Sequence, residues 1–174
     1  MTEKIIIYDP DKYIKFQPQA NPLAMVLNFH RDGYLDLNPD YQRGNVWNPE
    51  QKVELIDSIF KDIEIGKFAI IEHGLRPKDG SFVLEMLDGK QRFLACYDFY
   101  VDKFKYENMF LSEMHEYDQF HFTHYIIEVV YTGNITKKQK LEYFLRLNTK
   151  GVEQDKKHIK YVKELLEKEK NDRR

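Results

Sequence analysis

The sequence predicts a mixed α/β (α+β) domain in which a small mixed sheet is flanked by helices. Short apolar runs rich in β-branched and aromatic residues, typical of strands, alternate with segments whose apolar residues recur at helical spacing. Two of the strand-like runs are neighbours separated by a turn-rich stretch, which indicates a hairpin. The chain has 174 residues, of which 42% are hydrophobic, so it can bury one core. We therefore expect a single domain over residues 1–174.

The N-terminal part is expected to contain a strand at residues 4–8, a proline-punctuated loop, and a helix over residues 22–30. Asn21 precedes Pro22, and proline suits the first helical position, so Asn21 is the expected N-cap. The apolar spacing predicts which side chains of this helix face the core: Leu23, Val26, Leu27 and His30.

A stronger helix start signal follows an extended segment at residues 34–47. Asn48 is the expected cap, Pro49 occupies the first helical position, and Gln51 stands at the third position, where it completes a capping box. This combination predicts a helix over residues 49–63.

The middle and the end of the chain are expected to alternate between strands and helices. Runs at residues 67–73 and 81–87 should pair antiparallel, and a helix should begin close after the second run. A further strand is expected at residues 124–132, followed by a helix from a Thr136 cap to about Leu147. The last segment, residues 156–174, is expected to form a charged amphipathic helix. Its apolar face holds Ile159, Val162, Leu165 and Leu166.

Composition and charge narrow the classes of function. The chain carries 27 Lys and Arg against 29 Asp and Glu, a net charge of −2, so no basic surplus drives tight DNA binding. Any DNA contact is expected to be weak or indirect. Cys96 is the one cysteine, which excludes an internal disulfide, and it is expected to be buried. Neither a signal peptide nor an apolar run of about 18 residues is present, so we expect a cytoplasmic protein without membrane contact.

Residues 88–92 read DGKQR and lie where a predicted strand meets a predicted helix. In one interpretation Asp88 is the N-cap and Gln91 its reciprocal partner in a capping box. This leaves Lys90 and Arg92 unexplained, because cations in the first turn oppose the helix macrodipole. In the other interpretation the corner binds an anion such as phosphate, which reverses that electrostatic argument.

Two other polar stretches allow both a structural and a ligand-binding interpretation. Gln42 and Arg43 occupy a loop with Tyr41 and Trp47 beside them. The planar fork of arginine suits phosphate, and the aromatic rings either stack on a base or anchor the loop. Asn148 stands at the end of a predicted helix, where it either caps carbonyl groups or binds a ligand.

Together the three stretches resemble the ordered signatures of the N-terminal domain family of GmrSD-type modification-dependent restriction endonucleases. The resemblance spans residues 23–160 and implies a ParB/sulfiredoxin-like fold with nucleotide binding and hydrolysis. Lys90 replaces the first glutamine of the family's usual DGQQR and adds a positive charge. The stretches that carry the resemblance are LDLNPDYQRGNVWNPEQKVELIDSIF, VLEMLDGKQRFLACYDF and FLRLNTKGVEQDKKHI.

The resemblance implies a role for each polar residue. Asp88 is the expected Mg²⁺ ligand and Gln91 the residue that orients water or phosphate, so these two are the expected catalytic residues. The expected cofactors are Mg²⁺ and a nucleoside triphosphate whose base the sequence leaves open. The expected nucleotide contacts are Gln42, Arg43, Gly89, Lys90, Arg92 and Asn148.

Full enzymes of this type carry an HNH nuclease domain, and the histidines of this chain have no such frame. His115, His121 and His124 lack cysteine partners and are expected to be surface or partly buried residues rather than metal ligands. We therefore expect no DNA cleavage by this chain alone, which then acts either by itself or as the regulatory half of a split system with a separate HNH nuclease partner. Two alternatives stay open: a non-catalytic DNA-binding module that senses modification, and a stand-alone interaction protein of a phage or mobile element.

Overall fold

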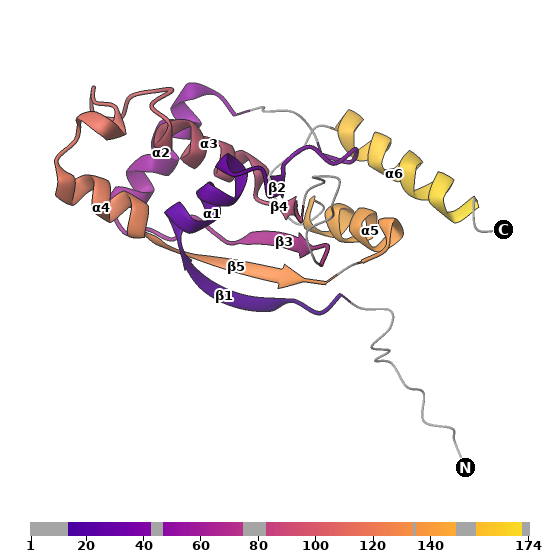
Figure 1. The fold of residues 1–174 in the computed structure, drawn as a ribbon. Helices are drawn as coiled ribbons and strands as arrows, with labels where there is room; N and C mark the ends of the chain where they lie inside the picture. Colours follow the sequence, from indigo (N-terminus) through magenta and orange to yellow (C-terminus); the bar gives the residue numbers. More distant parts are fainter. Residues whose placement is uncertain (1–13, 43–46, 75–82, 134, 149–155, 172–174) are drawn as a thin grey trace, which may run out of the picture.

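The computed structural model of the protein describes residues 14–42, 47–74, 83–133, 135–148 and 156–171 (Figure 1). Its five strands form one mixed sheet in the order β1-β5-β3-β4-β2. β1 runs antiparallel to β5, β3 is parallel to β5 and antiparallel to β4, and β2 is parallel to β4. The mixed α/β class is thereby confirmed. The strands are β1 Gln17–Pro22, β2 Leu35–Asp36, β3 Phe68–Glu72, β4 Leu84–Asp88 and β5 Ile126–Thr132.

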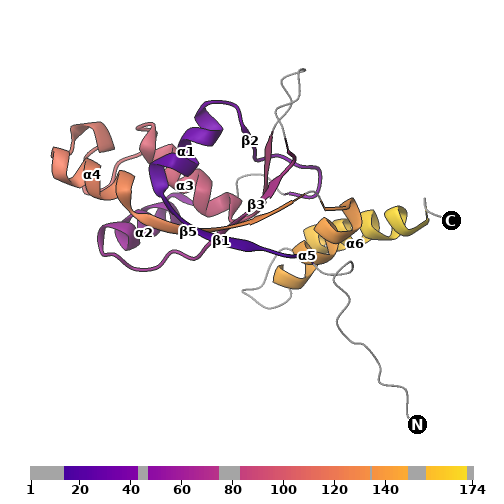
Figure 2. The same ribbon diagram turned by 60° about the horizontal axis from the view of Figure 1, so that its bottom comes forward.

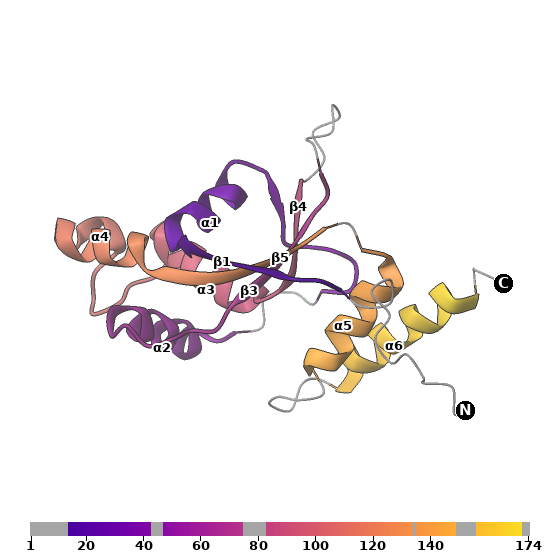
Figure 3. The same cartoon turned by 90° about the horizontal axis from the view of Figure 1, so that it is seen from below.

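The helices divide into two groups, which lie at opposite ends of the molecule and cover opposite faces of the central strands (Figure 1). Helices α1–α4 gather at one end, while α5 and α6 lie side by side at the other (Figures 1, 2 and 3). A short 3-10 helix, η1, precedes α4. The bounds are α1 Leu23–Arg31, α2 Pro49–Phe60, α3 Lys90–Tyr100, η1 Leu111–Glu113, α4 Glu116–His124, α5 Lys137–Asn148 and α6 Lys156–Asn171.

The central strands bury side chains on both faces because each face packs against one helix group. On β3, Phe68 and Ile70 join the core formed with α1–α4. Ala69 and Ile71 point the other way and join a second core with α5 and α6. This alternation explains why the strand sequence is continuously apolar rather than alternating.

The start of α1 differs from the prediction. Leu23, Val26 and Leu27 are buried as expected, but Asn21 belongs to β1, and Pro22 is the N-cap residue without a side-chain cap. The reason is that β1 pairs with β5 up to the helix itself. β1 falls in the segment predicted as a loop, because its two prolines resemble a loop; an edge strand tolerates them. The strand predicted at residues 4–8 lies outside the described residues.

Several other local predictions are confirmed. Asn48 and Gln51 form the capping box of α2, with Gln51 N donating to Asn48 Oδ1 at 2.8 Å and Asn48 N to Gln51 Oε1 at 3.0 Å. Strands β3 and β4 pair antiparallel, and Thr136 Oγ1 accepts from Gln139 N at 3.2 Å at the start of α5. α2 ends at Phe60, three residues earlier than predicted, and α4 is a helix that the sequence did not predict.

Cys96 is buried in the core, and desolvation raises the pKa of its thiol to about 12. The thiol therefore stays protonated at neutral pH and acts as a small apolar side chain. Across the described ranges, every helix is too short or too polar to cross a bilayer.

Candidate functional site

A sharp corner joins β4 to α3 and defines the candidate site. β4 ends at Asp88, Gly89 adopts the left-handed conformation with φ of 94°, and α3 begins at Lys90. A Cβ atom at Gly89 would lie 2.6 Å from Cδ1 of Phe68. Both the positive φ and the close ring therefore require glycine here. The turn sets the Asp88 side chain beside the first turn of α3.

The capping interpretation of this corner is wrong. Gly89, not Asp88, is the N-cap residue of α3, and no side chain caps this helix in the described structure. Gln91 Oε1 lies 3.4 Å from the backbone N of Trp47 rather than folding back as a capping partner. The left-handed residue moves the helix start one position along the chain. The first turn of α3 therefore keeps its positive dipole without an acidic side chain.

The Lys90 side chain is buried, and only 6% of the residue's surface is exposed. Its Nζ donates to Asn38 Oδ1 at 3.0 Å, just beyond β2. Burial lowers the pKa of Lys90, while the charge of Asp36 acts in the opposite direction. Lys90 thus links the corner to the β2 side of the sheet.

Arg92 reaches the opposite side of β4. Its Nη1 donates to Ile65 O at 2.8 Å and its Nη2 lies 3.4 Å from Asp88 Oδ2. The guanidinium also sits 5.9 Å from the centre of the Phe68 ring, within cation–π range. The Asp88 side chain is 41% exposed, so its carboxylate is accessible for a metal ion or another ligand.

The loop that follows β2 docks onto this corner. Gln42 Nε2 donates to Leu87 O at 3.0 Å and to Met86 O at 3.3 Å, at the end of β4. The hydrogen bonds of Lys90 and Gln91 already described anchor the same loop at two further points. Two of the three polar stretches singled out in the sequence therefore meet. Arg43 lies outside the described residues.

The third stretch approaches through α5. This helix contacts β4, and burial together with the charge of Asp88 raises the pKa of Tyr143. Asn148 is the last residue of α5, and its side chain is outside the described part. Its contact with a ligand stays a prediction.

The same three stretches lie within a family match. The model of the family described as GmrSD restriction endonuclease, N-terminal domain, matches residues 23–171. The chain belongs to this family. No curated protein and no solved structure matches the chain. Membership of the GmrSD N-terminal domain family makes the chain a component of a restriction system and relates it to phage defence.

This GmrSD-family domain also contains a buried polar network that sequence reasoning missed. The Glu85 carboxylate is 7% exposed and accepts from Tyr41 OH at 2.6 Å and from Lys140 Nζ at 2.6 Å. His73 Nε2 lies 2.8 Å from Glu85 Oε2, the same oxygen that accepts from Lys140. Desolvation favours the neutral acid, but the hydrogen bonds from Lys140 and Tyr41 outweigh it and lower the pKa of Glu85. The signal in the sequence that could have revealed this network is the acidic Glu85 inside the otherwise apolar strand-like run at residues 82–87.

The network holds the C-terminal helices of the GmrSD-family domain against the site loop. Tyr41 lies in that loop, Glu85 on β4 and Lys140 on α5. α6 adds a contact between His158 Nε2 and Tyr41 O at 3.1 Å. Because Tyr41 adjoins Gln42, this cluster positions the loop that contacts the β4–α3 corner.

The donor set at the corner suits magnesium bound together with a phosphate. In the described part of the chain, no three His, Cys, Asp or Glu side chains gather into a metal site. Mg²⁺ commonly takes one or two protein carboxylates and completes its shell with phosphate and water oxygens. Asp88 fits that role. His115 and His124 are exposed and His121 is partly buried, as predicted.

Proposed function

We propose that this domain binds a Mg²⁺–nucleoside triphosphate complex at the β4–α3 corner, hydrolyses it, and thereby regulates a nuclease partner. The observation that carries the proposal is the Gly89 turn. It sets an accessible carboxylate, Asp88, beside a helix N-terminus that carries Arg92 in its first turn and that no side chain of the described residues caps. A helix start of this kind favours anions.

Each group at the corner has a distinct proposed task. Asp88 would hold the metal ion, and the first N–H groups of α3 with Arg92 would bind phosphate oxygens. Mg²⁺ neutralises phosphate charge when it is bound. Gln91 would orient water toward the terminal phosphate. Lys90, which is tied to Asn38, supports the loop and adds positive potential; Gln42, Arg43 and Asn148 are the further proposed nucleotide contacts.

Thermal melting with Mg²⁺ and each of the four ribonucleoside triphosphates tests the proposal. A ligand at about a hundredfold excess over its dissociation constant stabilises the folded state by about 2.7 kcal/mol. For a chain of this size that corresponds to a rise of roughly 5–10 °C in melting temperature. Release of inorganic phosphate then reports hydrolysis. If no nucleotide changes the melting temperature, the proposal fails and the interaction-protein alternative gains support.

The DNA-binding alternative has its own test. Because the chain carries a net charge of −2, the isolated domain is expected to bind unmodified duplex DNA weakly, and less as salt rises. A mobility-shift titration at several salt concentrations measures this. Tight binding that barely responds to salt would contradict the expectation and favour a DNA-reading module.

A further inference from the structure

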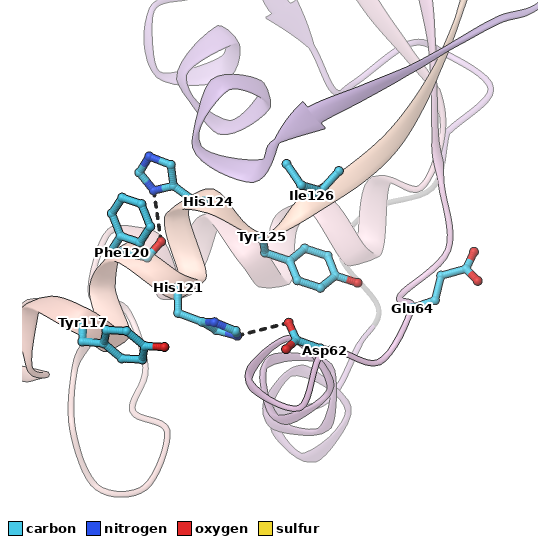
Figure 4. A pocket seen from close by; sticks show the side chains of 8 residues that line it. All are labelled: Asp62, Glu64, Tyr117, Phe120, His121, His124, Tyr125 and Ile126. Atoms are coloured by element: carbon cyan, nitrogen blue, oxygen red, sulfur yellow. Dashed lines mark hydrogen bonds and ion pairs between the residues drawn. The ribbon is translucent and has the colours of Figure 1, made fainter.

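A pocket of about 550 Å³ lies at the α4 end of the molecule, remote from α5 and α6 (Figures 1 and 4). It is formed where the connection between α2 and β3 meets α4 and the start of β5. We call it the aromatic–acidic pocket. It is lined by two acidic side chains, by two histidines and by aromatic and aliphatic side chains: Asp62, Glu64, His121, His124, Tyr117, Phe120, Tyr125 and Ile126.

The apolar part of the aromatic–acidic pocket is unusually exposed. Tyr117 is 72%, Phe120 59% and Ile126 58% exposed, and Ile63 next to Asp62 is 53% exposed. Exposed apolar side chains scattered singly are ordinary, but a group of them rimmed by polar residues is typical of a binding surface. This group covers more area than a single small cation needs, which favours a peptide over a free ion.

The acidic part of the aromatic–acidic pocket has no cationic partner from lysine or arginine within the described ranges. Asp62 Oδ1 lies 3.4 Å from His121 Nε2, and Glu64 is exposed. The two neighbouring lysines are engaged elsewhere, since Lys61 pairs with Asp57 at 2.7 Å and Lys67 with Glu128 at 3.8 Å. The pocket therefore offers negative charge to a partner.

The carboxylates of Asp62 and Glu64 lie on one side of the pocket and the rings of Tyr117 and Phe120 on the other (Figure 4). The His121 ring lies between Tyr117 and Asp62, and the Tyr125 ring lies beside the two carboxylates (Figure 4). A cationic side chain placed at the carboxylates would gain charge-assisted hydrogen bonds from them and a cation–π contact with the Tyr125 ring (Figure 4).

The walls of the aromatic–acidic pocket are held in place. Tyr125 OH donates to Ile63 O at 2.9 Å and so ties the end of α4 to the α2–β3 connection. His124 stacks on Phe120 with ring centres 3.8 Å apart, and its Nδ1 lies 3.0 Å from Phe120 O. Preformed walls reduce the entropy lost when a ligand binds.

We infer that the aromatic–acidic pocket binds a basic, partly apolar peptide segment of a protein partner. An arginine or lysine of that segment pairs with the carboxylates of Asp62 and Glu64, and its apolar neighbours cover Ile126 and Phe120. DNA is not the occupant, because the two carboxylates repel phosphate. The inference is independent of nucleotide binding, since none of these residues lies at the β4–α3 corner.

Fluorescence anisotropy with a labelled hexapeptide of sequence Arg-Leu-Lys-Phe-Arg-Leu tests the inference on the full chain. The peptide is expected to bind, and a version with glutamate at each basic position is not. The double variant Asp62→Asn, Glu64→Gln should weaken binding about tenfold because it removes both charges. Asp62 has φ of 54°, a conformation that asparagine tolerates, so the variant should fold. The matched control Asp32→Asn, Glu72→Gln, which removes two exposed charges elsewhere, should bind normally.

The rings are tested separately. Phe120→Ala should weaken binding of the basic peptide about fivefold or more through loss of apolar contact. Tyr161→Ala, which removes an exposed ring on α6, should leave it unchanged. The inference is overturned if the basic peptide does not bind at millimolar concentration or if the double variant binds it as well as the wild type. It is also overturned if sedimentation shows self-association that Phe120→Ala abolishes, because the occupant is then a second copy of the chain.

Discussion

The Asp88→Asn protein is expected to melt within about 2 °C of the wild type and to lose its stabilisation by Mg²⁺ and nucleoside triphosphate. The first result follows because Asp88 caps no helix and is 41% exposed. The second follows because asparagine keeps the shape of the side chain but lacks the charge that a magnesium ligand supplies. Melting curves with and without Mg²⁺ and each nucleotide measure both effects.

A matched control separates the site from general surface charge. Asp32 forms an exposed ion pair with Arg31 at 2.9 Å, as Asp88 pairs with Arg92. Asp32→Asn should therefore keep the full nucleotide-dependent rise in melting temperature. If Asp88→Asn shows the same rise as the wild type, Asp88 does not hold the metal ion.

The Glu85→Ala variant is expected to lose about 3–5 kcal/mol of unfolding free energy, because removing one partner leaves a buried charge uncompensated. Here Lys140 loses its partner at 2.6 Å, and Tyr41 OH loses its acceptor. Urea denaturation measures the change. Glu72→Ala, an exposed glutamate on the neighbouring strand β3, is the control and should change stability by no more than about 0.5 kcal/mol. A loss below about 1 kcal/mol for Glu85→Ala would show that the network contributes little.

The same glutamate predicts a pH dependence. The pKa of Glu85 in the folded protein lies below the ordinary value of 4.5. The ionised carboxylate therefore contributes its full stabilisation at pH values above 4.5. The contribution is lost as the pH falls below 4.5 through the folded pKa. The Glu85→Gln variant should lack this component, so the difference in stability between wild type and variant should shrink under acidic conditions.

Features that depend on neighbouring residues could be predicted from the sequence. The capping box of Asn48 and Gln51 needs only a spacing of three and a following proline, and it forms as expected. The capping interpretation of Asp88 and Gln91 rested on the same spacing and is wrong, because the left-handed φ of Gly89 shifts the helix start. Spacing alone does not reveal that shift, since glycine is compatible with either conformation.

Edge strands and weakly patterned helices were harder to predict. β1 contains Pro18 and Pro22, which resemble a loop, yet its pairing with β5 makes it a strand at the edge of the sheet. Only a partner strand distant in sequence decides such a case, because an isolated strand has no hydrogen bonds of its own. α4 lacks a clear apolar stripe, since of its residues only Phe122 is buried, so periodicity gave little indication of it.

The sequence by itself determined the order of most elements, the three polar stretches and their resemblance to the GmrSD N-terminal domain family, because these depend on local spacing and residue type. Only the tertiary structure decided which partner each polar side chain has. Lys90 and Arg92 are two residues apart, yet one bonds Asn38 beyond β2 and the other Ile65 before β3. Those partners lie 52 and 27 residues away along the chain. Hydrogen bonds over such separations follow from strand order and helix packing, and no local pattern of residues specifies them.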